Sequence, residues 1–112
     1  MTVAELPAFA RDADRILGEQ SHRQLIEYLG LHPEAGLVIP DTSGVRKLRW
    51  IAPGRGKRGG ARVIYYFHNE NLPILALAIY AKNEKVDVNT KDKKQMKAAV
   101  HEYVKSHTGG KR

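Results

Sequence analysis

Apolar side chains recur at helical spacing near the start of the chain and predict two short helices. In residues 7–17 they fall three or four positions apart, Pro7 suits a first helical turn, and Gly18 offers a C-terminal stop. Ser21 opens a capping-box pattern, so we expect a second helix that starts there and ends at Gly30. The two helices are predicted to form a hairpin that serves as scaffold.

The middle of the chain is rich in β-branched and aromatic residues, which predicts strands. The three expected strands are residues 45–51, 62–68 and 74–80. The last two are almost continuously apolar, which is typical of central strands covered on both faces. If they pair antiparallel about a turn near Asn71, Arg62 lies opposite Tyr80. The pattern therefore brings these two side chains to one end of a sheet.

The last part of the chain returns to helical spacing from Thr90, a residue suited to a helix N-cap. We expect residues 108–112 to be a flexible tail and residues 31–44, with two prolines and two glycines, to be a connector. The predicted fold is α+β, with an N-terminal helical hairpin packed on an antiparallel sheet and a C-terminal helix. Because the chain has only 112 residues, we expect one domain over residues 1–112.

Composition removes several classes of function. The chain has no cysteine, so it has no disulfide, no thiolate metal site and no cysteine nucleophile. No apolar run approaches the roughly 20 residues that span a bilayer, and the first residues lack a secretory signal pattern. We therefore expect a cytoplasmic protein without membrane partners.

The net charge of +7 is unevenly distributed along the chain. Residues 1–44 hold three basic and seven acidic side chains, a balance of −4, whereas residues 45–112 hold sixteen basic and five acidic side chains, a balance of +11. A basic field on one part of a small protein attracts a polyanion, so nucleic acid is the leading partner. A soluble protein with a lysine-rich exposed helix is the alternative interpretation.

Seven basic residues without an acidic neighbour lie between positions 46 and 62, together with four glycines at positions 54, 56, 59 and 60. The basic residues are Arg46, Lys47, Arg49, Arg55, Lys57, Arg58 and Arg62. Glycine lets the backbone approach a ligand and arginine binds phosphate with two donors, so the segment suits a nucleic-acid backbone. It is not a Walker loop, because Gly60 stands where that motif needs lysine. An exposed loop without a ligand is the alternative.

The predicted strand register gathers this loop, Arg62, Tyr80 and Lys82 at one end of the sheet. Cations there can stabilise the developing charge of a scissile phosphate, and a tyrosine can stack on a base or donate a proton. Trp50, beside the loop, is expected to anchor the core, with base stacking as the alternative. The five histidines show no metal-ligand spacing, so we expect no metal site, and no other cofactor is expected. We expect His68 to lie at the surface.

Three segments in order resemble the HigB branch of the RelE toxins: residues 44–50 (GVRKLRW), 53–67 (PGRGKRGGARVIYYF) and 80–85 (YAKNEK). The resemblance extends over nearly the whole chain and implies a RelE-like fold. It implies a toxin of a type II toxin–antitoxin pair that enters the ribosomal A site and cuts messenger RNA there. The family reaction is metal-free attack of a ribose 2′-OH on the adjacent phosphate. The implied partners are a cognate antitoxin, in a hetero-oligomeric complex, together with the ribosome and messenger RNA.

The resemblance also implies roles for particular residues. Arg62 matches the arginine that stabilises the transition state, Arg55 and Lys57 match basic residues of the preceding loop, and Lys82 follows the third strand. One loop residue would hold the phosphate or take the 2′-OH proton. Asn89 stands near the position where some relatives carry a catalytic tyrosine, so Tyr80 is the candidate substitute, and the general acid and base stay unassigned. The expected RNA-binding residues are Arg46, Lys47, Arg49, Arg58, Lys85 and Trp50.

Two other functions fit parts of the pattern. A helix, three strands and a lysine-rich helix is also the order of double-stranded-RNA-binding domains, which bind without catalysis. The extra N-terminal helix and the lack of a matching helix-start motif count against that class. A ParE-like gyrase inhibitor would share the scaffold, but such relatives generally lack a dense set of basic site residues, which the loop and Lys82 supply here.

Overall fold

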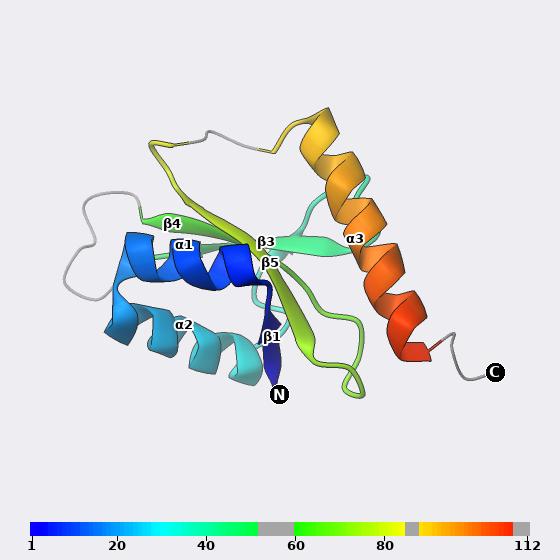
Figure 1. Cartoon of the computed structure of the whole chain (residues 1–112), viewed down its shortest axis with the longest axis horizontal. Coiled ribbons are helices and arrows are strands. Elements are labelled where there is room, and N and C mark those ends of the chain that lie inside the picture. The colour runs from blue at the N-terminus through cyan, green and yellow to red at the C-terminus, as the bar shows by residue number, and fades with distance from the viewer. Residues whose placement is uncertain (52–59, 85–87, 109–112) are drawn as a thin grey trace.

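The computed structural model of the protein describes residues 1–51, 60–84 and 88–108. Within these ranges the chain forms three helices and a five-stranded sheet, as expected for an α+β fold (Figure 1). The elements in chain order are β1 (Val3–Glu5), α1 (Pro7–Leu17), α2 (Glu19–Leu31), β2 (Leu37–Val38), β3 (Val45–Trp50), β4 (Ala61–Tyr66), β5 (Ile74–Ala81) and α3 (Thr90–Thr108).

The strands lie in the order β1-β5-β4-β3-β2. β3, β4 and β5 pair antiparallel, as predicted, and β2 also pairs antiparallel with β3, but β1 pairs parallel with β5, so the sheet is mixed. Neither β1 nor β2 was expected from the sequence, because runs of three and two residues are too short to show alternation. The segment expected to be only a connector therefore contains an edge strand, β2.

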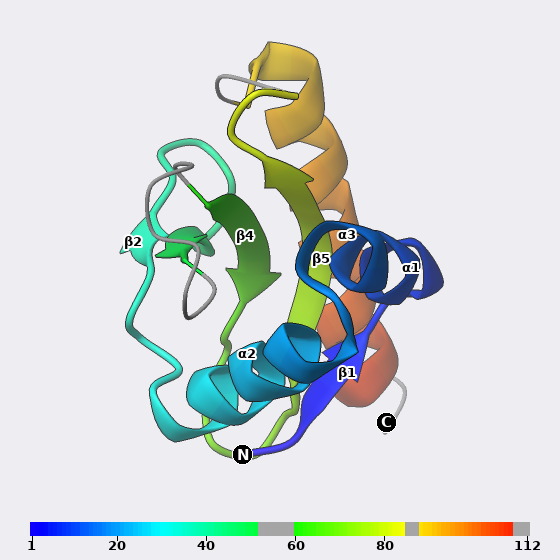
Figure 2. The same cartoon turned by 90° about the vertical axis from the view of Figure 1, so that its left-hand side faces the viewer.

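The sheet separates two apolar cores, with the helical hairpin on one face and α3 on the other (Figure 2). Phe9 of α1 and Leu25 of α2 are completely buried against one face, which includes Val63 of β4. Ile64, the next residue of β4, points to the other core, where it lies with Val100 of α3. Because both faces are covered, β4 is apolar at almost every position, as the sequence predicted.

The start of α2 differs from the prediction. The helix begins at Glu19, directly after Gly18, which has a φ of +83° and donates its N–H to the Asp14 carbonyl oxygen at 2.9 Å. This left-handed conformation, which glycine adopts without strain, makes the turn between the helices. Ser21 is not a cap, since its buried Oγ accepts a hydrogen bond from Trp50 Nε1 at 3.1 Å. Its hydroxyl therefore connects α2 with β3.

Two other helix ends also differ from the prediction. The second helix continues through Gly30 to Leu31, and a Cβ at Gly30 would lie 2.5 Å from the Met1 carbonyl oxygen, so close approach of the chain explains this glycine. The N-cap of α3 is Asn89 and not Thr90. Asn89 Oδ1 accepts from the Asp92 N–H at 2.8 Å, while the Asp92 carboxylate accepts from the Asn89 N–H at 3.1 Å. This reciprocal pair satisfies two donors at the start of α3.

His22 connects α2 with β1 and α1. Its Nε2 lies 2.6 Å from Glu5 Oε1, its Nδ1 lies 2.6 Å from Asp14 Oδ1, and only 13% of the side chain is exposed. Partial burial opposes protonation, but the hydrogen bonds to Asp14 and Glu5 outweigh it and raise the pKa of His22 above its ordinary value of 6.5. The protonated ring can donate to both carboxylates and fasten the three elements together.

The His22 contacts predict a pH-dependent stability. Because the folded pKa is raised, the stabilisation is complete below pH 6.5 and is lost as the pH rises through the folded value. We expect the Tm of the protein to fall as the pH rises above 6.5, and we expect His22→Gln to remove this part of the pH dependence. Thermal melts of both proteins across neutral pH test the prediction. It would be contradicted if the Tm of the wild type and that of His22→Gln changed equally with pH.

Candidate nucleic-acid interface

Arg49 of β3, Arg62 of β4 and Tyr80 of β5 form one row across the three central strands. Arg49 pairs with Arg62 and Arg62 pairs with Tyr80, so the register expected for the last pair is confirmed. Directly opposed residues have Cβ atoms about 5 Å apart and point to the same face. Tyr80 belongs to the core beneath α3, which places the whole row on the α3 face of the sheet.

Lys47 extends this row along β3. It lies two residues before Arg49, on the same face by alternation, and pairs with Ile64 of the α3-side core. Arg49 is exposed, and Lys47 and Arg62 are partly exposed. We call Lys47, Arg49 and Arg62 the cation patch. The three positive charges lie on one surface of the sheet. The guanidinium groups of Arg49 and Arg62 can each donate two hydrogen bonds to an anion.

Tyr80 lies next to the cation patch, because it pairs with Arg62. Its ring is 9% exposed and lies in the core with Ile64 and Val100. The core therefore fixes Tyr80 at the position next to Arg62 on the same sheet face. A role for Tyr80 as a reacting group stays a sequence prediction.

The end of the sheet brings the start of β4 close to the turn after β5. The Lys82 N–H donates to the Gly60 carbonyl oxygen at 3.2 Å, and the Lys82 side chain is exposed. Gly60 has a φ of +64°, and a Cβ there would lie 2.3 Å from the Trp50 carbonyl oxygen, so only glycine fits where the chain enters β4. The candidates Arg55, Lys57, Arg58 and Lys85 lie outside the described residues.

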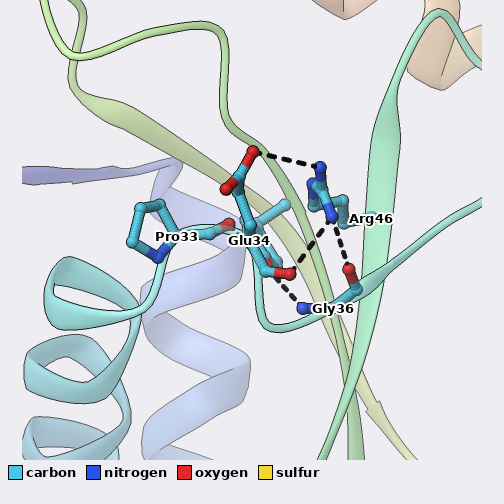
Figure 3. Close-up of polar contacts among 5 residues, drawn as sticks. Pro33, Glu34, Gly36 and Arg46 are labelled. Atoms are coloured by element: carbon cyan, nitrogen blue, oxygen red, sulfur yellow. Dashed lines mark hydrogen bonds and ion pairs between the residues drawn. The ribbon is translucent and has the colours of Figure 1, made fainter.

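Two of the predicted RNA-binding residues lie on the opposite face of the sheet. Arg46 Nη1 donates to the carbonyl oxygens of Gly36 at 2.7 Å and Glu34 at 3.2 Å, and Nη2 is 3.9 Å from Glu34 Oε2 (Figure 3). Trp50 packs against the helical-hairpin core with its ring 5.5 Å from that of Tyr28, which agrees with the core-anchor interpretation. The structure therefore does not bring Arg46 and Trp50 together with the cation patch.

An ion pair that sequence reasoning missed holds the turn after β5. Glu84 Oε2 accepts from Arg15 Nη1 of α1 at 2.8 Å, and Glu84 Oε1 accepts from the Ala81 N–H at 3.1 Å. The hydrogen bonds from Arg15 and from the Ala81 N–H lower the pKa of Glu84. The turn that carries Lys82 is thus tied to α1. The sequence contains no signal for this contact, because the partners are far apart in the chain.

Removing the Glu84 carboxylate is expected to loosen this turn without unfolding the protein. In Glu84→Ala the Ala81 N–H loses its acceptor and Arg15 keeps only its contact with Asp12, so we expect severalfold faster amide exchange at Ala81. The Tm should change little, because exposed ion pairs contribute little to stability. Hydrogen exchange measured by NMR tests this, with Glu70→Ala in an exposed turn as the control. Unchanged exchange at Ala81 would contradict the prediction.

The described residues offer few other groups that could bind a metal ion or take part in a reaction. Within them, no group of three or more histidine, aspartate or glutamate side chains is arranged to hold a metal ion. His68 is exposed, as predicted, and its Nδ1 lies 2.8 Å from the Tyr66 hydroxyl. None of the helices in residues 1–51, 60–84 and 88–108 is both long and apolar enough to cross a membrane.

The mixed sheet, the helices on its two faces and the cation patch define a small α+β protein with a cationic surface on one face of its sheet. Comparison of the sequence with models of known protein families identifies the class of this protein. The family model of the RelE toxin of the RelE/RelB toxin–antitoxin system matches residues 34–109, which include all three residues of the cation patch. The chain therefore belongs to the RelE toxin family. Toxins of this family are generally endoribonucleases, and the family implies an antitoxin partner.

Proposed function

We propose that this protein is a messenger RNA interferase of the HigB branch, which enters the ribosomal A site in the cytoplasm and cleaves the message there. The observation that carries the proposal is the row in which Arg49 and Arg62 pair across β3 and β4 on a partly exposed face. Two adjacent guanidinium groups match the oxygens of a phosphodiester. Residues 34–109 supply this row, and they are the part of the chain that matches the family.

The proposed reaction is transesterification without a metal ion. The ribose 2′-oxygen attacks the adjacent phosphorus, the bond from phosphorus to the 5′-oxygen breaks, and the products are a 2′,3′-cyclic phosphate and a 5′-OH. A general base takes the 2′-OH proton and a general acid protonates the leaving 5′-oxygen. Arg62, with Arg49 beside it, stabilises the charge that develops on the phosphate oxygens.

The remaining basic candidates complete the proposed site. Lys82 lies at the same end of the sheet as the start of β4, where it can hold the RNA backbone. Arg55 and Lys57 of the preceding loop are proposed to hold the phosphate or take the 2′-OH proton, and Tyr80 remains the tyrosine candidate. A cognate antitoxin in a hetero-oligomeric complex is proposed to inhibit this activity.

Cleavage of ribosome-bound messenger RNA by the purified protein tests the proposal. We expect cuts within translated reading frames, fragments ending in a 2′,3′-cyclic phosphate and a 5′-OH, and full activity in EDTA. Free RNA without ribosomes is the matched control and should be cut far more slowly. Cleavage that required a divalent metal, or that occurred only on free RNA, would contradict the mechanism.

A further inference from the structure

A groove of about 310 Å³ lies between α3 and the sheet. Ile64, Ala78 and Tyr80 of the sheet line one side, and Met96 and Ala99 of α3 line the other. Gln95 adds an exposed amide to this largely apolar lining, and Asp92 adds a carboxylate that accepts a hydrogen bond from the Asn89 N–H at 3.1 Å. The volume is at the lower end of the range found for small-ligand sites, which suits one planar ring system.

The groove is continuous with the cation patch. Tyr80 connects them, because it pairs with Arg62 of the patch and also lines the groove. Ile64 lies two residues after Arg62 on the same face of β4, a distance of about 7 Å along the strand. Lys47 in turn pairs with Ile64. A phosphate held by Arg62 would therefore place its attached nucleoside next to the apolar lining.

We propose that this groove holds one nucleobase of the RNA substrate, next to the phosphate bound by the cation patch, and that Gln95 contributes to the choice of base. The inference rests on the proposed function and deepens it. The side chains of Met96 and Tyr80 bury the base between them, since a thioether and an aromatic ring both pack well against a flat ring. The Gln95 amide offers both donors and an acceptor to the edge of the base.

Charge favours RNA as the occupant of the groove. Lys47, Arg49 and Arg62 lie on the same sheet face as Ile64 and Tyr80 of the groove, so three cations lie beside a lining whose one charged residue, within the part of the chain that the structure describes, is Asp92. A polyanion is attracted to this surface, and an apolar recess beside it accommodates the one apolar part of a nucleotide. An apolar antitoxin segment is the competing occupant and is treated as an outcome of the test.

Binding can be observed directly through Met96. The chain has two methionines, Met1 and Met96, so a methyl NMR spectrum contains one signal from the groove and one reference signal from the N-terminus. The probes are the four ribonucleoside 3′-monophosphates. We expect the Met96 methyl signal to shift on titration while the Met1 signal stays in place, and Gln95→Ala to reduce the differences in affinity among the four. A Met96 signal that moves with none of them would overturn the inference.

Cleavage patterns provide the second readout. Gln95→Ala is expected to lower total cleavage less than threefold but to reduce the preference for one base next to the cut by about tenfold, the scale of one lost two-point base contact. The matched control is Gln20→Ala, an exposed glutamine of α2. Ala99→Leu, which fills the groove, should lower cleavage about tenfold, whereas Ala98→Leu on the exposed side of α3 should not.

The outcomes separate this inference from the proposed function. If Gln95→Ala and Ala99→Leu cut with wild-type rate and preference while Arg62→Ala does not cut, the groove does not bind the base and the nuclease proposal stands. If Ala99→Leu cuts normally but resists the antitoxin, the groove binds the antitoxin and the inference is overturned. If Arg62→Ala cuts normally, the proposed function itself fails. Gln95 is exposed, so its variant decides the question even if Ala99→Leu does not fold.

Discussion

Arg62→Ala is expected to abolish the toxicity of this protein in growing cells. Arg62 occupies the centre of the row on the α3 face, between Arg49 and Tyr80, and its guanidinium keeps its charge at physiological pH. Loss of one preorganised donor to a transition-state oxyanion costs about 3 kcal/mol, which lowers the rate a hundredfold or more. Growth after induced expression, together with cleavage of ribosome-bound RNA in vitro, measures the effect.

The Arg62→Ala protein should remain folded. Arg62 is partly exposed and stands opposite another cation, Arg49, so its removal relieves repulsion between like charges. We expect a Tm equal to or above that of the wild type. Arg62→Lys should recover only part of the activity if the bidentate hydrogen bonding of the guanidinium group is required. Arg11→Ala, an exposed arginine of α1, is the control and should stay fully toxic.

A folded Arg62→Ala protein with wild-type toxicity would remove the centre of the proposed site. In that case the alternatives taken from the sequence, a non-catalytic RNA-binding module and a ParE-like gyrase inhibitor, would account better for the chain. Full recovery of activity by Arg62→Lys would instead show that one positive charge is sufficient at this position.

The largest loss of stability is expected from Tyr65→Phe. The Tyr65 side chain is completely buried, and its hydroxyl accepts from the Gly36 N–H at 2.8 Å and donates to the Pro33 carbonyl oxygen at 2.9 Å. Burial is the main reason that its pKa is raised, so the hydroxyl keeps its proton. Removing it deprives two backbone groups of their partner, at a cost of about 3 kcal/mol in the free energy of unfolding. For a chain of this size the Tm should fall by more than about 10 °C.

Tyr103→Phe is the matched control for this effect. The Tyr103 hydroxyl makes one hydrogen bond, to the Pro73 carbonyl oxygen at 2.6 Å, and its side chain is only partly buried. Its loss should cost about 1 kcal/mol. Denaturant titration of both variants gives the two free energies. Equal losses would mean that Tyr65 does not hold the connector before β2 in the way that its contacts indicate.

The sequence predicted the centre of the row because β4 and β5 are consecutive strands, so one antiparallel connection relates them. Once β4 and β5 are joined by a short turn, an antiparallel register follows, and the pairing of Arg62 with Tyr80 agrees with it. The register shifts between Ile64 and Tyr65, yet the row is on the side of the shift that was predicted correctly. The parallel pairing of β1 could not be predicted in this way, since its partner is far away in the chain.

The set of basic residues on β3 was harder to interpret, because charge alone does not tell which face a residue takes. Arg46, Lys47 and Arg49 form one cluster in the sequence, but alternation along the strand places Arg46 on the hairpin face, where it binds the connector. Applying the two-residue period to the charges would have separated them. For Gln95 no such signal exists, because its position depends on where α3 crosses the sheet.

The pairing of β1 with β5 also limits when, during synthesis, the sheet can be completed. Val3 is made before β2, β3 and β4, but its partner, Ile74, emerges from the ribosome only after all three. Contacts between such distant segments form late. The same strand, β5, brings Tyr80 to Arg62. An incomplete chain that stops before β5 therefore lacks the partner strand of β1 and the Tyr80 end of the row, so we expect it to be harmless to the ribosome that is making it.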